Sequence, residues 1–283
     1  MSVRVMGSRS VRLQAGGRPA KAGRCVLVAG IVTSIVSMFG AVPSAQQRGQ
    51  PPGPPPTPKA AAPIDLTGNW VAVVTEDWRW RMLMPRKGDY SSVPLSAEGK
   101  KIADTWDPGK LSSDGCKPYG AAGIMRVPGR LRVEWDNDTT LRIDADAGQQ
   151  TRLLHFDKSP APQSAGTWQG YSAAEWERIP QPGGLGVSIQ QAPPRVGSLK
   201  VVTTNLRAGY LRRNGVPYSE ETTVTEYFDR VSAYQSDWLT VLTIVDDPKY
   251  LSQQFITSTH FKREADASKW MPAPCEPGTS AAR

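Results

Sequence analysis

The sequence predicts an all-β fold, an antiparallel barrel of about nine strands with one short helix. Along several short runs, large apolar residues alternate with charged ones, which is typical of a strand with one buried and one exposed face. Turn-forming sequences such as 136–138 and 147–148 separate these runs. The chain shows neither a βαβ alternation nor a repeat of fixed period, so hairpin-linked strands in a barrel or sandwich are favoured.

The strand candidates follow one another from residue 67 onward. Leu131, Val133 and Trp135 give a clear example, because Arg132 and Glu134 stand between them. Enrichment in valine, threonine and aromatic residues supports the others. We expect strands over 67–75, 78–84, 130–135, 141–144, 150–156, 198–204, 222–229, 238–245 and 254–263.

Helical signals are confined to one stretch. Ser96 is a suitable N-cap, and the apolar residues that follow it as far as Trp106 share one side of a helix. Pro108 then ends the pattern. Farther along, residues 157–197 are rich in Pro and Gly, and we expect a long excursion there that contains one short strand near 167–171.

Composition divides the chain into four segments. A basic stretch, an apolar run over 25–42 and a few small residues have the layout of a secretory signal peptide, which we place at 1–45. A membrane anchor is the alternative interpretation of the apolar run. Seven prolines in residues 46–63 predict an extended, semi-rigid linker. The folded domain is expected over 64–271, and a disordered tail over 272–283.

The net charge argues against a nucleic-acid partner. The chain carries 34 Lys and Arg against 26 Asp and Glu, a net charge of +8. Six of the cations lie within residues 1–45, where there is no acid, so removal of that segment leaves a net charge of +2. This is too little for an electrostatic footprint on a polyanion. After signal cleavage we expect a periplasmic or secreted protein that is not an integral membrane protein.

The start of the domain resembles a known family. Residues 65–70 read Asp-Leu-Thr-Gly-Asn-Trp, and Gly68 with Trp70 matches the Gly-x-Trp pattern of lipocalin-like barrels. This resemblance implies that Trp70 closes one end of the barrel and that Arg263, late in the last strand, packs across it. The residue types suit these roles, because Gly permits a close backbone approach and Trp is a bulky plug.

Three later stretches resemble an uncharacterised group of secreted bacterial proteins. They are 197–206, 214–231 and 239–251. That resemblance implies architecture and compartment, and no activity. Relative to a plain lipocalin, the excursion at 157–197 and the tail after residue 264 are extra.

Cysteine and histidine usage limits the chemistry of any site. After signal removal only Cys116 and Cys275 remain, and an even pair in an oxidising compartment predicts one disulfide. With two histidines and no ligand spacing, we expect no metal site and no cofactor. His155 and His260 are candidate acid/base residues, since imidazole titrates near neutrality. Packing and surface roles are the alternatives.

Candidate ligand-binding residues come from three stretches. Four of them would form the apolar face of a strand over 78–84, which either lines a cavity or fills a core. Three others would offer polar contacts on loops at an open barrel end, where a solvated charged loop is the alternative. The residues are Trp78, Trp80, Met82, Met84, Arg126, Tyr210 and Arg212.

The first hypothesis is a secreted or periplasmic barrel that binds a small hydrophobic or amphipathic molecule. The alternative is an isomerase, cyclase or lyase acting on a hydrophobic substrate in the barrel cavity, with a histidine as its acid or base. A structural or adhesion module is the third. The fold does not choose among these three, because function is carried by individual sites.

Overall fold

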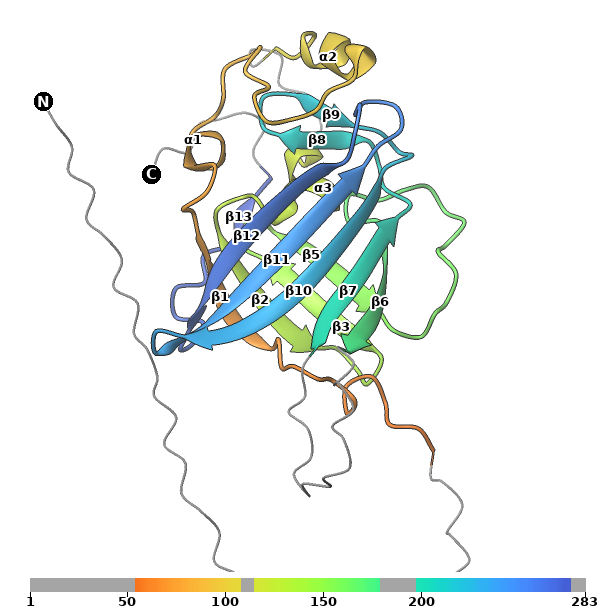
Figure 1. Cartoon of the computed structure of the whole chain (residues 1–283), viewed down its shortest axis with the longest axis vertical. Helices are drawn as coiled ribbons and strands as arrows, with labels where there is room; N and C mark the ends of the chain where they lie inside the picture. The colour runs from red at the N-terminus through yellow and green to blue at the C-terminus, as the bar shows by residue number, and fades with distance from the viewer. Residues whose placement is uncertain (1–53, 108–114, 179–196, 276–283) are drawn as a thin grey trace, which may run out of the picture. The chain divides into compact units, whose positions relative to one another are not determined.

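The protein forms one closed barrel. The computed structural model describes residues 54–107, 115–178 and 197–275, and within them nine strands close on themselves (Figure 1). Neighbouring strands run antiparallel except β5 (Gln150–His155) and β6 (Tyr171–Arg178), which pair in parallel. The predicted all-β barrel is confirmed, although its sheet is mixed. The predicted signal peptide, 1–45, lies outside the described residues.

The remaining elements are seven barrel strands and several short segments. The other barrel strands are β1 (Gly68–Val73), β2 (Arg130–Trp135), β3 (Thr140–Ala145), β7 (Gly197–Thr204), β10 (Thr223–Ala233), β11 (Ser236–Asp246) and β12 (Phe255–Glu264). The short segments are α1 (Trp78–Arg81), α2 (Ala97–Ala103), the 3₁₀ turn η1 (Lys117–Tyr119), α3 (Ala121–Ile124), β4 (Ala147–Gly148), β8 (Gly209–Arg212), β9 (Val216–Tyr218) and β13 (Ala273–Pro274). In Figure 1, α2, β8 and β9 lie above the barrel.

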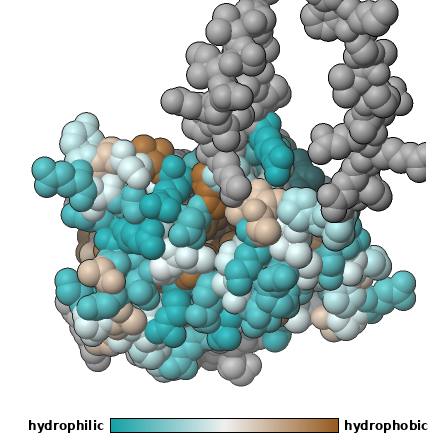
Figure 2. All heavy atoms as spheres, turned by 90° about the horizontal axis from the view of Figure 1, so that it is seen from below, coloured by the Kyte–Doolittle hydropathy of each residue, from teal (hydrophilic) through white to brown (hydrophobic). Residues whose placement is uncertain are grey.

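The lower end of the barrel, here called the floor, is closed by Trp70. Its side chain is fully buried, and its indole N–H donates to the carbonyl of Leu66 at 3.0 Å. The guanidinium of Arg263 lies 5.5 Å from the centroid of the Trp70 ring, so the expected contact is present. Gly68 has φ of +129°, and a Cβ there would lie 3.1 Å from Nη2 of Arg263. Seen from below, this end is mainly hydrophilic (Figure 2).

Side chains from alternate strand positions fill the barrel. A large apolar cluster that includes Trp70, Leu154, Phe228 and Phe261 lies within the barrel and extends up to Ile124 of α3. A second cluster, which includes Tyr218, is formed in part by residues of α3 and of the β8–β9 hairpin. These upper elements form a cap, so the end expected to be open is covered.

A buried ion pair lies inside the barrel wall. Arg152 is 2% exposed and Glu226 is fully buried, and Nη2 of the arginine lies 2.7 Å from Oε2 of the glutamate. The hydroxyls of Thr203 and Ser172 accept from the same guanidinium, at 3.1 and 3.4 Å. The two charges of this pair therefore neutralise each other, although Nε of Arg152 has no hydrogen-bond partner among the described residues.

Three sequence expectations need correction. Residues 78–84 contain the helical turn α1 in place of a strand. The excursion 157–197 contains an eight-residue barrel strand, β6, where only a short strand near 167–171 was expected. Residues 272–275 of the expected tail are held to the domain, because β13 pairs with β4 and Cys275 is joined to Cys116 by a disulfide, and residues 276–283 lie outside the described residues. That disulfide confirms the predicted pairing.

The predicted helix and linker have clear structural counterparts. Ser96 caps α2, since its hydroxyl accepts from the backbone N–H of Gly99 at 3.0 Å. The second half of the linker lies against the barrel, with the indole of Trp176 donating to the carbonyl of Pro58 at 2.9 Å. In the described part of the chain, no helix is long and apolar enough to cross a membrane.

Candidate functional site

Three buried arginines converge where α1, α3 and β8 meet. Arg81, Arg126 and Arg212 are 4%, 7% and 5% exposed. Together with Trp80 they line a small cavity of about 20 Å³. We call these four residues the arginine site. Burying three cations together is costly unless each finds a partner, so the partners decide what the site can do.

Two of the three arginines form ion pairs. Nη1 of Arg81 lies 2.6 Å from Oε1 of Glu76, and Nη2 of Arg126 lies 2.8 Å from Oδ2 of Asp77. Arg212 has no ion pair to a carboxylate among the described residues. It donates from Nη1 to the carbonyl of Ser91 at 2.7 Å.

Several buried donor atoms in the site have no acceptor. They are Nη2 of Arg81, Nη1 of Arg126, and both Nε and Nη2 of Arg212, none of which has a hydrogen-bond partner within the described chain. Buried polar groups in folded proteins are nearly always hydrogen-bonded. Because all four atoms are cationic donors, an anion with several acceptor oxygens would satisfy them, as water molecules also would.

The local electrostatics are consistent with this. Burial, and then the charge of Arg126, lowers the pKa of Arg212 to about 10. Burial also lowers the pKa of Arg81, against the opposing effect of Glu76. These shifts show that the guanidinium groups are destabilised in their charged form. A bound anion would relieve that destabilisation.

Local structure explains why the arginines point inward. Asp77 adopts a left-handed backbone conformation, with φ of 52°, and precedes α1, a few residues after the end of β1. A bulge in β8 between Tyr210 and Arg212 changes the register of the hairpin. The buried amide of Asn214 then donates to the carbonyls of Arg86 and Asp89, which ties the segment after α1 to the hairpin.

The structure brings together only some of the residues expected to bind ligand. Trp80 and Arg212 are in contact, with the guanidinium carbon 5.1 Å from the ring centroid, and Arg126 lies beside them in the cavity wall. Trp78 and Met82 are 57% and 53% exposed on α1, so they line no barrel cavity.

The remaining two candidates also lie apart from the site. Met84 is half-buried in the segment after α1. The ammonium nitrogen of Lys117 lies 5.5 Å from the ring centroid of Tyr210, and Tyr210 does not line the cavity. Sequence analysis missed Arg81, because in a strand its side chain would have faced outward. The helical spacing of Asp77 and Arg81 was the available signal.

Both histidines lie on the outer wall of the barrel. His155 stacks on Tyr171, with ring centroids 4.9 Å apart and an interplanar angle of 7°. Nδ1 of His260 lies 3.5 Å from Oε2 of Glu76, and its side chain is 40% exposed. Neither faces the interior, where the enzyme hypothesis needed an acid or base.

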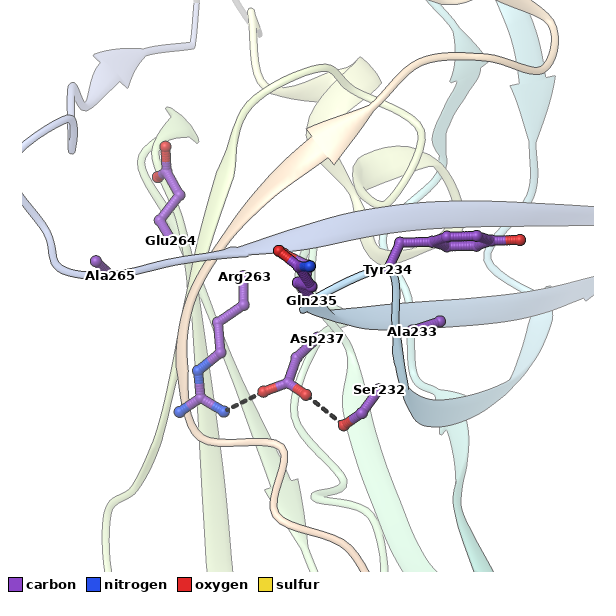
Figure 3. A pocket seen from close by; sticks show the side chains of 9 residues that line it. Ser232, Ala233, Tyr234, Gln235, Asp237, Arg263, Glu264 and Ala265 are labelled. Carbon is purple, nitrogen blue, oxygen red and sulfur yellow. Dashed lines mark hydrogen bonds and ion pairs between the residues drawn. The ribbon is translucent and has the colours of Figure 1, made fainter.

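A larger hollow at the floor has a different character. It has a volume of about 600 Å³ and is lined by the β10–β11 turn and the end of β12 (Figure 3). Asp237 binds both Arg263, at 3.4 Å, and Ser232. Because its charged groups neutralise one another at an open surface, the hollow does not call for a charged ligand.

The described residues offer no group of metal ligands, and comparison with known proteins identifies no family. Across residues 54–107, 115–178 and 197–275, no group of three or more His, Cys, Asp or Glu side chains is placed to hold a metal ion. Comparison of the chain with protein-family models, curated proteins and solved structures gave no match in any of the three.

Proposed function

We propose that this protein is a secreted or periplasmic, lipocalin-like barrel that binds a small amphipathic molecule through an anionic group at the arginine site. The observation that carries the proposal is the set of four buried guanidinium nitrogens that have no acceptor among the residues that the structure describes. The secreted location rests on the signal-like sequence and is supported by the Cys116–Cys275 disulfide. The lipocalin-like relationship rests on the contact between Trp70 and Arg263.

The size of the cavity limits what enters it. A volume of about 20 Å³ has room for about one or two water molecules, so it admits a terminal group and no more. A carboxylate, phosphate or sulfonate matches the forked donors of arginine. The apolar remainder of the ligand would lie outside, against the partly buried ring of Trp80.

A pair of matched fluorescent probes tests the proposal. Anilinonaphthalenesulfonate carries a sulfonate, and N-phenylnaphthylamine has the same aromatic body without it. We expect the anionic probe to bind more tightly than the neutral one. Arg212→Gln should weaken the anionic probe by about tenfold or more, because a charge-assisted hydrogen bond is lost, and should leave the neutral probe unchanged.

The control variant is Arg178→Gln. Arg178 is exposed near the floor and donates to the carbonyl of Ala61, so its loss changes the net charge equally without touching the site. Equal affinities of wild type and Arg212→Gln for the anionic probe would refute the proposal. The same conclusion would follow if Arg178→Gln weakened binding as much as Arg212→Gln.

A further inference from the structure

The outer side of α1 and the residues after it expose three large apolar side chains. Trp78, Met82 and Leu83 are 57%, 53% and 55% exposed. The exposed Val231 and Ile256 lie elsewhere, on barrel strands. These three exposed side chains lie within six residues of the sequence, and we call them the apolar patch. Clustered exposed apolar side chains mark interaction sites, whereas single ones do not.

Unneutralised cations flank this patch. In residues 76–89 each carboxylate is engaged by an arginine: Glu76 by Arg81, Asp77 by Arg126 and Asp89 by Arg79. Three exposed cations lie beside the patch in the sequence, namely Arg79, Arg86 and Lys87. Arg86 and Lys87 form no ion pair within the described residues. The segment therefore offers apolar side chains and free positive charge on one exposed stretch.

We propose that residues 78–87 dock onto an anionic lipid surface. Trp78, Met82 and Leu83 would enter the headgroup region, and Arg86 with Lys87 would contact lipid phosphates. Tryptophan beside basic residues is typical of segments that bind at a membrane interface. Anionic lipids attract each nearby Lys or Arg, and this attraction is screened by salt.

Charge favours a lipid surface over a second copy of the chain. In a twofold dimer, the same patch meets itself, so both copies would bring Arg86 and Lys87 to one interface. Like charges across such an interface oppose association. An anionic bilayer instead complements them. The docking side chains are not among the four residues of the arginine site, so the two proposals can fail separately.

Sedimentation with lipid vesicles tests the docking proposal, and it uses the whole protein as it is secreted. Wild type should bind vesicles of phosphatidylcholine mixed with phosphatidylglycerol at least fivefold better than phosphatidylcholine alone, and added salt should release it. The triple variant Trp78→Ser/Met82→Ser/Leu83→Ser should reduce the binding at least fivefold. Its control, Val231→Ser/Ile256→Ser, removes side chains of similar exposure, 54% and 56%, and should bind like wild type.

A second pair of variants tests the charges. Arg86→Gln/Lys87→Gln should weaken binding to the anionic vesicles and remove most of the salt dependence. Lys100→Gln/Lys101→Gln removes the same charge from the exposed surface of α2 and should have little effect. The Arg212→Gln variant should bind vesicles normally, which separates this proposal from the small-ligand function.

Two outcomes would overturn the proposal. In the first, the triple variant and wild type sediment equally, which would place any lipid contact elsewhere on the chain. In the second, wild type ignores anionic vesicles but self-associates in light scattering, and the triple variant is monomeric. A second copy of the chain, and not a membrane, would then cover the patch.

Discussion

The floor and the arginine site both place a tryptophan beside arginine, and they treat the cation in opposite ways. At the floor, Arg263 lies over Trp70, is 32% exposed and shares Asp237 with Arg230. At the arginine site, Arg212 lies over Trp80, is nearly fully buried and has no carboxylate partner among the described residues. The geometry of the ring contact is similar, with distances of 5.5 and 5.1 Å.

The two ends differ in whether the N–H groups of the arginine find acceptors. A half-exposed, paired arginine stabilises the fold through packing and a modest ion pair. A buried arginine with free N–H groups destabilises it, because the desolvation is not offset. Sites that oppose stability are candidates for binding function. This is why we propose a structural role for Arg263 and a binding role for Arg212.

The largest expected effect concerns the floor. Trp70→Ala should lower the free energy of unfolding by about 3–5 kcal/mol, because a large buried ring leaves a cavity. Arg263→Ala should cost about 1–3 kcal/mol through lost packing and cation–π contact. Urea unfolding of both single variants and the double variant measures the coupling. The double variant should lose less than the sum, and strictly additive losses would contradict a shared contact.

The second effect concerns the buried pair that lies between the two ends. Glu226→Gln should cost about 3 kcal/mol, because Arg152 would be left as a buried cation without its counter-ion. Arg152→Met/Glu226→Leu should cost clearly less than that single variant, since neither charge remains. Urea unfolding at neutral pH distinguishes them. A double variant as unstable as Glu226→Gln would show that lost packing, and not the unpaired charge, dominates.

Sequence patterns predicted those barrel strands that carry large apolar residues on one face and polar residues on the other. Most of the strand β6 was not predicted, because two of its inward residues, Ser172 and Ala174, are small and only Trp176 is bulky. They leave room for Arg152, whose Nη2 lies 3.4 Å from the Ser172 hydroxyl. Where a strand packs against a buried arginine, it lacks the alternation of large apolar and charged residues on which the prediction relied.

The candidate site was only partly predictable for a similar reason. Alternating Trp and Arg over 78–81 fits a strand as well as a short helix, and only the position of Asp77 in a left-handed turn decides between them. Arg126 and Arg212 were identified as polar contacts from nearby loops. Their convergence with Arg81 depends on long-range packing, which a pattern within one segment does not encode.

The third effect concerns Asp247, a buried carboxylate in the cap, at the same end of the barrel as the arginine site. Asp247 is 1% exposed. Burial opposes its ionisation, but hydrogen bonds from the backbone N–H of Ser219 and Tyr250 and from the Thr222 hydroxyl outweigh this and lower its pKa. Even at this end, then, a buried charge with enough donors supports the fold.

The sign of the pH dependence follows from that lowered pKa. The unfolded state, with an ordinary carboxyl pKa of about 4, takes up a proton before the folded state does. The stabilisation is therefore present above about pH 4 and is lost as the pH falls through the folded-state pKa. Asp247→Asn should cost about 2 kcal/mol at pH 6, and its difference from wild type should shrink below pH 4. A difference independent of pH would contradict this role.

The smallest expected effect has the opposite sign and tests the comparison most directly. Arg212→Met keeps much of the side-chain volume and removes a buried cation with two unused donors. We expect it to raise the free energy of unfolding of the ligand-free protein by about 1 kcal/mol, as replacement of poorly compensated buried charges often does. Arg263→Met, at the floor, should instead lower it, because that arginine is paired.

Affinity measured on the same two proteins completes the argument. Arg212→Met should bind anilinonaphthalenesulfonate about tenfold or more weakly, while Arg263→Met should bind it normally. A gain in stability together with a loss of affinity is the expected signature of a residue retained for binding. If Arg212→Met were destabilising by as much as Arg263→Met, the unused donors would carry no cost. Both arginines would then be structural, and the distinction between the two ends would fail.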